Sequence, residues 1–219
     1  MLETKTPTRP ASVHGEEAPY QRLRAAIASG ELLPNERLVE AELAQSLEVP
    51  RGAVRMAIVR LAQENLVERM PNRGARVRRI SEKEGVELLE ARMALECLAA
   101  EHAARNATPD DITMLRGTLA EMEASLNGDP LDYGALNARF HHEIVRIADH
   151  ATAARLLESL RSRNTIFHFR SIAVPNDPGL RFQQHCDIVH AIAAHDPKRA
   201  VAAMRGHLSD VAARLRAKL

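Results

Sequence analysis

The sequence predicts a mainly α-helical protein with an N-terminal winged helix-turn-helix and a C-terminal all-helical bundle. Three observations support this fold class: two short helical patterns joined by a tight turn, a strand–turn–strand pattern directly after them, and almost no strand signal beyond Ser81. Of the 219 residues, 45% are hydrophobic, which suffices for one large domain or two smaller ones. We expect a flexible arm over residues 1–18, a winged-helix domain over 19–80 and a helical domain over 81–219.

The arm is predicted because residues 1–18 are rich in Thr, Pro, Ser and Glu and show little hydrophobic periodicity. The spacing of apolar residues after Tyr20 predicts a first helix that ends at Ser29-Gly30. Helices at Glu40–Leu47 and Gly52–Glu64, separated by Glu48-Val49-Pro50, form a helix-turn-helix pattern. The following segment LVERMPNRGARVRRI predicts a β-hairpin wing around its PNRG turn.

The pattern of the second half of the chain predicts a helical bundle. A capping box of Ser81 and Glu84 opens a helix that reaches about Arg105, and Thr108 caps a second helix that ends near residues 127–128. Four further helices are expected: after residue 132, from about 151, over 180–195, and from 196–197 to the C-terminus.

The chain has a net charge of only +1, but it contains a strongly basic segment: residues 51–80 have eight arginines and two glutamates. Such a run is often only a solvated face, but here it coincides with the helix-turn-helix and the wing, which favours nucleic acid as partner. Arg51 and Arg55, four residues apart, share one helix face, and a guanidinium can donate two hydrogen bonds to guanine in the major groove. In the wing, Gly74 allows the backbone close to a duplex, and Arg73 or Arg76 can reach phosphate or the minor groove.

Membrane and disulfide-dependent classes are excluded by composition. The longest apolar runs are far shorter than the ~20 residues of a membrane span, and the N-terminus lacks the apolar stretch of a signal peptide. Cys97 and Cys186 lie in predicted helices without CxxC spacing, which indicates reduced core thiols. We expect a cytoplasmic protein with no membrane partner.

Three histidines and an asparagine fall beside the apolar stripes of three predicted helices. His141 lies one turn after Asn137 in the stretch NARFHHEIV, His185 shares a face with Val189, and His207 shares one with Leu208. The neighbouring His142 lies on the polar face. Imidazoles that converge inside a bundle are typical of a divalent-metal site, with a zinc, nickel or manganese-like ion. Histidines hydrogen-bonded within the core, with no metal, are the structural alternative.

Arg92 is a second inward polar residue, because its i±3 and i±4 neighbours are Leu88, Leu89 and Leu95. A buried guanidinium needs an anion. Glu96 at i+4 can supply one as a structural ion pair, or a ligand carboxylate can bind there.

The segment from IASGELLPNERL to MPNRGARV resembles the winged-helix domain of GntR-type bacterial transcription regulators. The later phrases EARMALE, NARFHHEIV, QQHCDIVHAIAAHD and AVAAMRGHL resemble, in order, the motifs of the helical FCD ligand-binding domain of the family's FadR-like branch. Together the matches cover about residues 20–215. The resemblance implies a repressor that binds a palindromic double-stranded DNA operator as a homodimer and is released by a small organic or sugar acid bound beside a divalent metal.

The resemblance also implies roles for particular residues. The DNA-binding candidates are Arg51, Gly52, Arg55, Arg73, Gly74 and Arg76. The metal ligands are Asn137, His141, His185 and His207, with Asn137 where the family commonly has Asp. The ligand-binding candidates are Arg92, Arg139, Arg163 and Asn164. The recognition helix departs from the family pattern, because Pro50 precedes Arg51 and Met56 replaces a common Glu.

A different class of function stays open from the residues alone. Three histidines with an open coordination position also describe a metal-dependent hydrolytic enzyme, with Glu143 or Asp187 as general base. DNA binding without turnover separates the two classes, and we predict a regulator that is not an enzyme.

Overall fold

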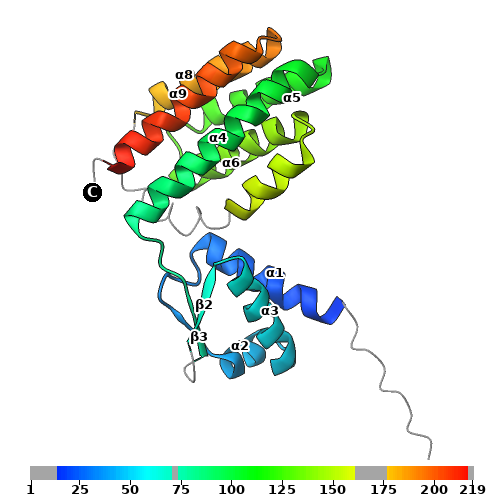
Figure 1. The fold of residues 1–219 in the computed structure, drawn as a ribbon, viewed down its shortest axis with the longest axis vertical. Helices are drawn as coiled ribbons and strands as arrows, with labels where there is room; N and C mark the ends of the chain where they lie inside the picture. Colours follow the sequence, from blue (N-terminus) through cyan, green and yellow to red (C-terminus); the bar gives the residue numbers. More distant parts are fainter. Residues whose placement is uncertain (1–13, 71–73, 161–176, 217–219) are drawn as a thin grey trace, which may run out of the picture. The chain divides into compact units, whose positions relative to one another are not determined.

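The computed structural model describes residues 14–70, 74–160 and 177–216 (Figure 1). Its contacts divide the chain into two compact units, Met1–Arg79 and Ile80–Leu219, and each is described by itself. The sequence placed this division one residue later, between residues 80 and 81. No helix in the described ranges is long and apolar enough to cross a membrane.

The first unit is a winged helix-turn-helix, as predicted. Its helices are α1 (His14–Ser29), α2 (Glu40–Ser46) and α3 (Arg51–Gln63), and its strands are β1 (Arg37–Leu38), β2 (Val67–Met70) and β3 (Gly74–Val77). The strands form an antiparallel sheet in the order β1-β3-β2. The two-residue strand β1 was not predicted.

The start of α1 corrects the predicted arm. Residues 14–18 are helical, although the sequence assigned no structure before residue 19, and the rest of the arm, residues 1–13, lies outside the described residues. Glu17 in this first turn receives a hydrogen bond of 2.6 Å from Arg60 of α3 and one of 2.7 Å from Gln21. The helix is therefore extended by a tertiary contact and not by its own apolar periodicity.

The helix-turn-helix core follows from the spacing of apolar residues along α3. Val54, Ile58 and Leu61, at spacings of four and three, are at most 3% exposed, and this face packs against α1 and α2. Pro50 precedes α3 in an extended conformation and cannot continue α2, so the chain turns there. The wing is confirmed as a hairpin in which Val67 pairs with Val77 and Met70 with Gly74.

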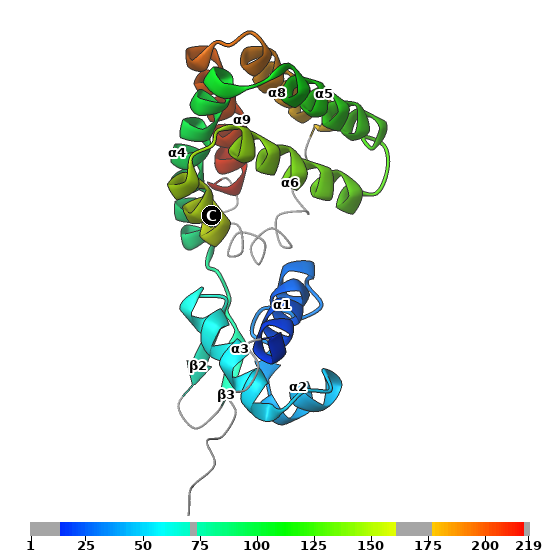
Figure 2. The same ribbon diagram turned by 90° about the vertical axis from the view of Figure 1, so that its right-hand side faces the viewer.

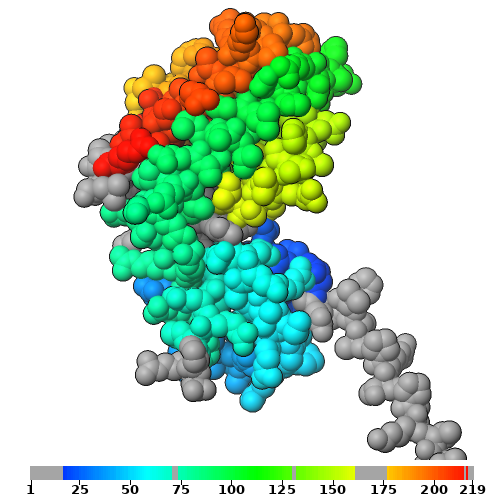
Figure 3. Space-filling model, viewed as in Figure 1, coloured from blue at the N-terminus to red at the C-terminus, as the bar shows by residue number. Residues whose placement is uncertain are grey.

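The second unit is a helical bundle. It contains α4 (Glu82–Asn106), α5 (Pro109–Ala124), α6 (Pro130–Ile147), α8 (Pro178–Ala193) and α9 (Pro197–Arg216), and residues 151–160 are helical as well. α4 packs along α9 and α6, α8 packs on α9, and α5 contacts α6 and α8 (Figure 2). α4 and α9 lie side by side over one face of the unit (Figure 3).

Helix caps set the ends of these helices largely where the sequence placed them. Ser81 Oγ accepts a hydrogen bond from the Glu84 N–H, and α4 begins at the next residue. Thr108 and Asp111 form a complete capping box at the start of α5, which ends at Ala124, three residues before the predicted end.

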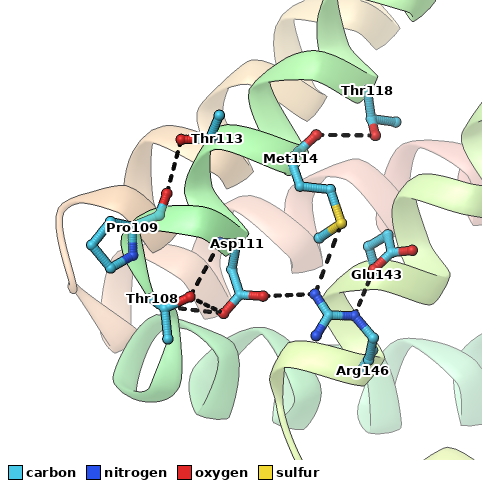
Figure 4. A network of polar contacts seen from close by, with 8 residues as sticks. All are labelled: Thr108, Pro109, Asp111, Thr113, Met114, Thr118, Glu143 and Arg146. Carbon is cyan, nitrogen blue, oxygen red and sulfur yellow. Dashed lines mark hydrogen bonds and ion pairs between the residues drawn. The ribbon is translucent and has the colours of Figure 1, made fainter.

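The same Asp111 ties α5 to the end of α6. Its Oδ1 accepts a 2.6 Å hydrogen bond from Arg146, which also donates to Glu143 at 2.7 Å (Figure 4). This network joins the first turn of α5 to the last turn of α6 and so fixes the helix that carries Asn137 and His141.

Candidate metal centre and nucleic-acid interface

Three histidines from three helices converge in the core of the helical unit. His141 comes from α6, His185 from α8 and His207 from α9, and their side chains are at most 3% exposed. One ring nitrogen of each lies within 4.8 Å of the others. The His185 and His207 ring centroids are 4.4 Å apart, and the His141 and His207 rings stack at 5.3 Å. The helical spacing predicted that these three histidines face the core, and the structure places them together there.

The outward nitrogen of each ring faces a protein oxygen. The Nδ1 atom of His141 lies 2.5 Å from Glu96 Oε2, and that of His207 lies 3.2 Å from Gln184 Oε1. The Nδ1 atom of His185 lies 3.4 Å from the Tyr133 hydroxyl. In metal sites a ligating histidine donates its other N–H to such an acceptor, which fixes the tautomer and leaves the second nitrogen for the ion.

The inward nitrogens have the environment that a cation satisfies. No described residue hydrogen-bonds to the Nε2 atom of His141 or of His207, although both side chains are buried. A neutral imidazole nitrogen with no hydrogen-bond partner can ligate a divalent ion, and one ion can bind several such nitrogens at once. Ligands bound at about 2.1 Å to one ion lie about 3.4 Å apart in a tetrahedral site and about 3.0 Å apart when adjacent in an octahedral one, so the histidine rings have to close from their separation of up to 4.8 Å.

Asn137 lies at the same place. Its Oδ1 atom is 2.9 Å from the Nε2 atom of His185. This distance fits a hydrogen bond from a protonated Nε2, and it also fits two neighbouring ligands of one ion. Asn137 therefore joins the cluster as the fourth candidate ligand and brings no negative charge.

The protonation states favour metal binding. Burial, followed by the fields of His207 and His141, lowers the pKa of His185 well below its ordinary value. Burial and the field of His141 lower the pKa of His207 to about 3. Both rings are therefore neutral at pH 7, which is the form that ligates a metal.

Glu96 connects the cluster to Arg92. Its Oε1 atom accepts a hydrogen bond of 2.8 Å from Arg92 Nε and forms an ion pair with Arg92 Nη2 at 2.6 Å, while Oε2 faces His141. Burial alone would raise the pKa of Glu96, but the charges and hydrogen bonds of Arg92 and His141 outweigh it and hold the pKa well below its ordinary value. Arg92 is thus engaged in the structural ion pair that the sequence offered as one of two readings, and two of its donor groups are not available to a ligand.

Of the other predicted ligand-binding residues, the described one, Arg139, does not join the cluster. Arg139 is exposed, and it donates hydrogen bonds to Glu121 at 2.6 Å and Thr118 at 3.4 Å, both on α5. Arg163 and Asn164 lie outside the described residues. His142 is exposed, as its place on the polar face predicted.

Sequence reasoning missed three residues around the cluster: Tyr133, Gln184 and Arg181. Tyr133 precedes Asn137 by four residues and Arg181 precedes His185 by four, so a helical-face test extended by one turn would have found both. The contact of Gln184 with His207 joins α8 to α9 and has no local sequence signal.

On the winged-helix unit, the predicted recognition residues lie at the start of α3. Arg51, Gly52 and Arg55 are exposed there. Arg51 makes no ion pair with another described residue, whereas Arg55 donates to both carboxylate oxygens of Glu40 at 2.8 to 3.1 Å. Arg51 is therefore available to a base as it stands, and Arg55 has to leave Glu40 first.

In the wing, Gly74 opens β3 with a φ of +83°, which favours glycine, and a Cβ there would lie 3.5 Å from the Leu38 carbonyl oxygen. Arg76 pairs across the hairpin with Glu68 at 2.5 Å, so its charge is largely balanced within the sheet. Arg73 lies outside the described residues.

A winged helix-turn-helix with exposed arginines, in one chain with a second, helical unit, is typical of a DNA-binding transcription regulator. Comparison with known families agrees: residues 16–77 match the bacterial regulatory proteins of the gntR family, and residues 87–210 match the FCD domain. The chain belongs to the GntR family and carries an FCD domain.

Individual relatives support this assignment. The chain is 28% identical over 217 residues to the HTH-type transcriptional repressor RspR of Escherichia coli K12, covering 98% of this chain and 93% of that protein. It is 33% identical over 185 residues to a "Probable D-xylose utilization operon transcriptional repressor" of Paenarthrobacter nicotinovorans, covering 84% and 80%. Among solved structures, E. coli McbR/YncC shares the fold with a TM-score of 0.80 at 21% identity, covering 94% of this chain and 99% of that one.

The protein is a transcription regulator and not an enzyme, since its relatives and its fold belong to regulators. The two acids considered as a general base are engaged elsewhere. Glu143 pairs with Arg146, and Asp187 accepts a hydrogen bond of 3.2 Å from Gln183.

Proposed function

We propose that this protein is a repressor that binds its operator as a homodimer and is released by a small carboxylate effector bound beside a divalent metal. The observation that carries the proposal is the buried cluster of His141, His185 and His207 inside the effector domain. Repression is supported by the descriptions of two relatives, RspR and the xylose-operon protein, as repressors.

The metal is assigned to the histidine cluster with Asn137 as a further ligand. The residues fit a divalent ion because the buried rings are held through their Nδ1 atoms and turn their Nε2 atoms inward. A bound ion supplies a positive charge that attracts an anionic oxygen. The neutral donor set leaves this charge uncompensated, because Asn137 stands where a carboxylate would neutralise part of it.

Dimeric DNA binding follows from the symmetry of the interaction. Two winged-helix units related by a two-fold axis match a palindromic duplex, with the start of each α3 in a major groove. The effector then weakens binding if it favours an arrangement of the two units that does not match the operator spacing.

DNA selection tests the first part of the proposal. Full-length protein selected against a random double-stranded pool should enrich an inverted repeat, and the complex with one such duplex should contain two chains by sedimentation. Enrichment of a single half-site, or a complex with one chain, would contradict the dimeric repressor.

Thermal melting after chelation tests the metal. Return of zinc, nickel or manganese should raise the melting temperature of wild type and of His142→Ala, and leave His141→Ala unchanged. His142 is the matched control because it is the next residue on the same helix and is exposed. An equal response of all three proteins, or no response of wild type, means that the histidines are core packing only.

A further inference from the structure

Arg181 is a half-buried guanidinium that pairs with no acidic side chain among the described residues. It lies in the first turn of α8, four residues before His185 and therefore on the same face of the helix. No described residue forms an ion pair or hydrogen bond with its guanidinium, and the centroid of the Tyr133 ring lies 5.6 Å from the Arg181 Cζ atom. Arg92 and Arg139, by contrast, are paired with Glu96 and Glu121.

The surroundings of Arg181 increase its need for an anion. Burial lowers its pKa; the phenol of Tyr133 opposes this effect, while the second guanidinium of Arg214 adds to it. The acid nearest to Arg214 in sequence, Asp210, lies 4.0 Å from that guanidinium and already accepts a hydrogen bond from Gln184. Residues 161–176, which precede α8 and lie outside the described part, contain three arginines and no Asp or Glu, so they bring no carboxylate side chain.

The position of Arg181 links this charge to the histidine cluster. Tyr133, which Arg181 contacts, has its hydroxyl 3.4 Å from the Nδ1 atom of His185. The positive field of Arg181 also acts on both His185 and His207. The cluster is buried, whereas Arg181 is half-buried, so its guanidinium is accessible to an anion from solvent while the histidines are not.

We propose that Arg181, and not Arg92, binds the carboxylate of the effector, with Tyr133 beside it and the histidine cluster one turn further along α8. This rests on the proposed function and names the residue and the chemical group that its effector requires. A planar guanidinium with unused donors can pair with two oxygens of a carboxylate or of a phosphate. A carboxylate is favoured because its single negative charge is balanced by one guanidinium, whereas a phosphate group carries more charge.

The experiment compares wild type with Arg181→Gln, Arg181→Lys and Arg139→Gln as full-length, zinc-loaded proteins. The probes are glycolate, malate and gluconate, which are hydroxy acids of increasing size, with glycolamide as a neutral analogue and inorganic phosphate as the competing anion. Calorimetric titration should show that at least one acid binds wild type and Arg139→Gln equally. Arg181→Gln should weaken this binding about 10- to 100-fold, as expected for loss of a charged hydrogen bond. Arg181→Lys keeps the positive charge but loses the planar pair of donors, so its affinity for the acid should lie between those of wild type and Arg181→Gln. Glycolamide should not bind.

Several outcomes would overturn the proposal: no acid binds wild type, phosphate binds more tightly than every acid, or Arg181→Gln binds within twofold of wild type. Far-UV circular dichroism, zinc content and affinity for the selected duplex, measured on the same variants, separate this failure from others. If wild type holds no zinc or selects no DNA, the proposed function fails. If it does both and the acid affinity is independent of Arg181, only the present inference fails. Repeating the titration after chelation shows how much Arg181→Gln lowers the affinity for the acid with metal and without it.

Discussion

The substitution Glu96→Gln should destabilise the helical unit and weaken metal binding at the proposed histidine site. Glu96 is 1% exposed, and its two oxygens serve Arg92 on one side and His141 on the other. Removing one partner of a buried ion pair costs about 3–5 kcal/mol because the other charge is left uncompensated. The amide oxygen of glutamine can still accept from Arg92, so we expect the lower end, about 3 kcal/mol. For a domain of this size that lowers the melting temperature by about 6–12 °C.

The effect on the metal site has a separate cause. The carboxylate oxygen lies 2.5 Å from the Nδ1 atom of His141 and favours a proton on that nitrogen, which leaves the Nε2 lone pair for the cluster. A glutamine amide group facing Nδ1 favours the opposite tautomer. Loss of such a partner weakens metal affinity by about 10- to 100-fold.

The assay is urea unfolding followed at 222 nm, with zinc affinity measured by competition with a chromophoric chelator. Glu121→Gln is the control, because Glu121 also pairs with an arginine of the same unit, Arg139, at 2.6 Å, but with side chains 55% and 44% exposed. Such a pair contributes at most about 1 kcal/mol. Equal losses in the two variants, or an unchanged zinc affinity in Glu96→Gln, would refute the reasoning.

Three further predictions concern other parts of the chain. Arg51→Ala should lower affinity for the selected duplex by about 1–3 kcal/mol, or about 5- to 150-fold, in a fluorescence anisotropy titration at fixed salt; an unchanged affinity would remove Arg51 from the interface. Gly74→Ala should cost about 1 kcal/mol in urea unfolding because of its φ of +83°, and a neutral result would show that the wing relaxes. Asp111→Asn should cost about 1 kcal/mol at pH 7 after allowance for solvent screening. The side-chain hydrogen bonds from Arg146 and Thr108 lower the pKa of Asp111 from 3.8 to about 2, so this stabilisation is present above pH 4 and lost as the pH falls through 2. Wild-type and Asp111→Asn unfolding curves should therefore converge at low pH, and a constant difference would contradict the assignment.

The helical period was sufficient to predict which histidines face the core. His141, His185 and His207 each have apolar neighbours three and four residues away, so each lies on the apolar face of its helix. In a helical bundle this face packs into the core. The caps at Ser81 and Thr108 were predictable because capping depends on residues within one turn.

Contacts between helices could not be read in the same way. The i+4 spacing of Arg92 and Glu96 indicated their ion pair, but the contact of Glu96 with His141 depends on how α4 packs on α6. The start of α1 was missed because Glu17 is held by Arg60, 43 residues away. The strand β1 has two residues and exists only through its pairing with β3, which no local pattern encodes.

Metal stoichiometry tests the central claim, that the histidine cluster is the metal centre of the effector domain, most directly. Native mass spectrometry of full-length protein, loaded with zinc and freed of excess ions, gives the number of ions per chain. The account predicts one ion per chain in wild type and in His142→Ala, and none in His185→Ala. Wild type without a bound ion, or the same stoichiometry in all three proteins, would contradict it.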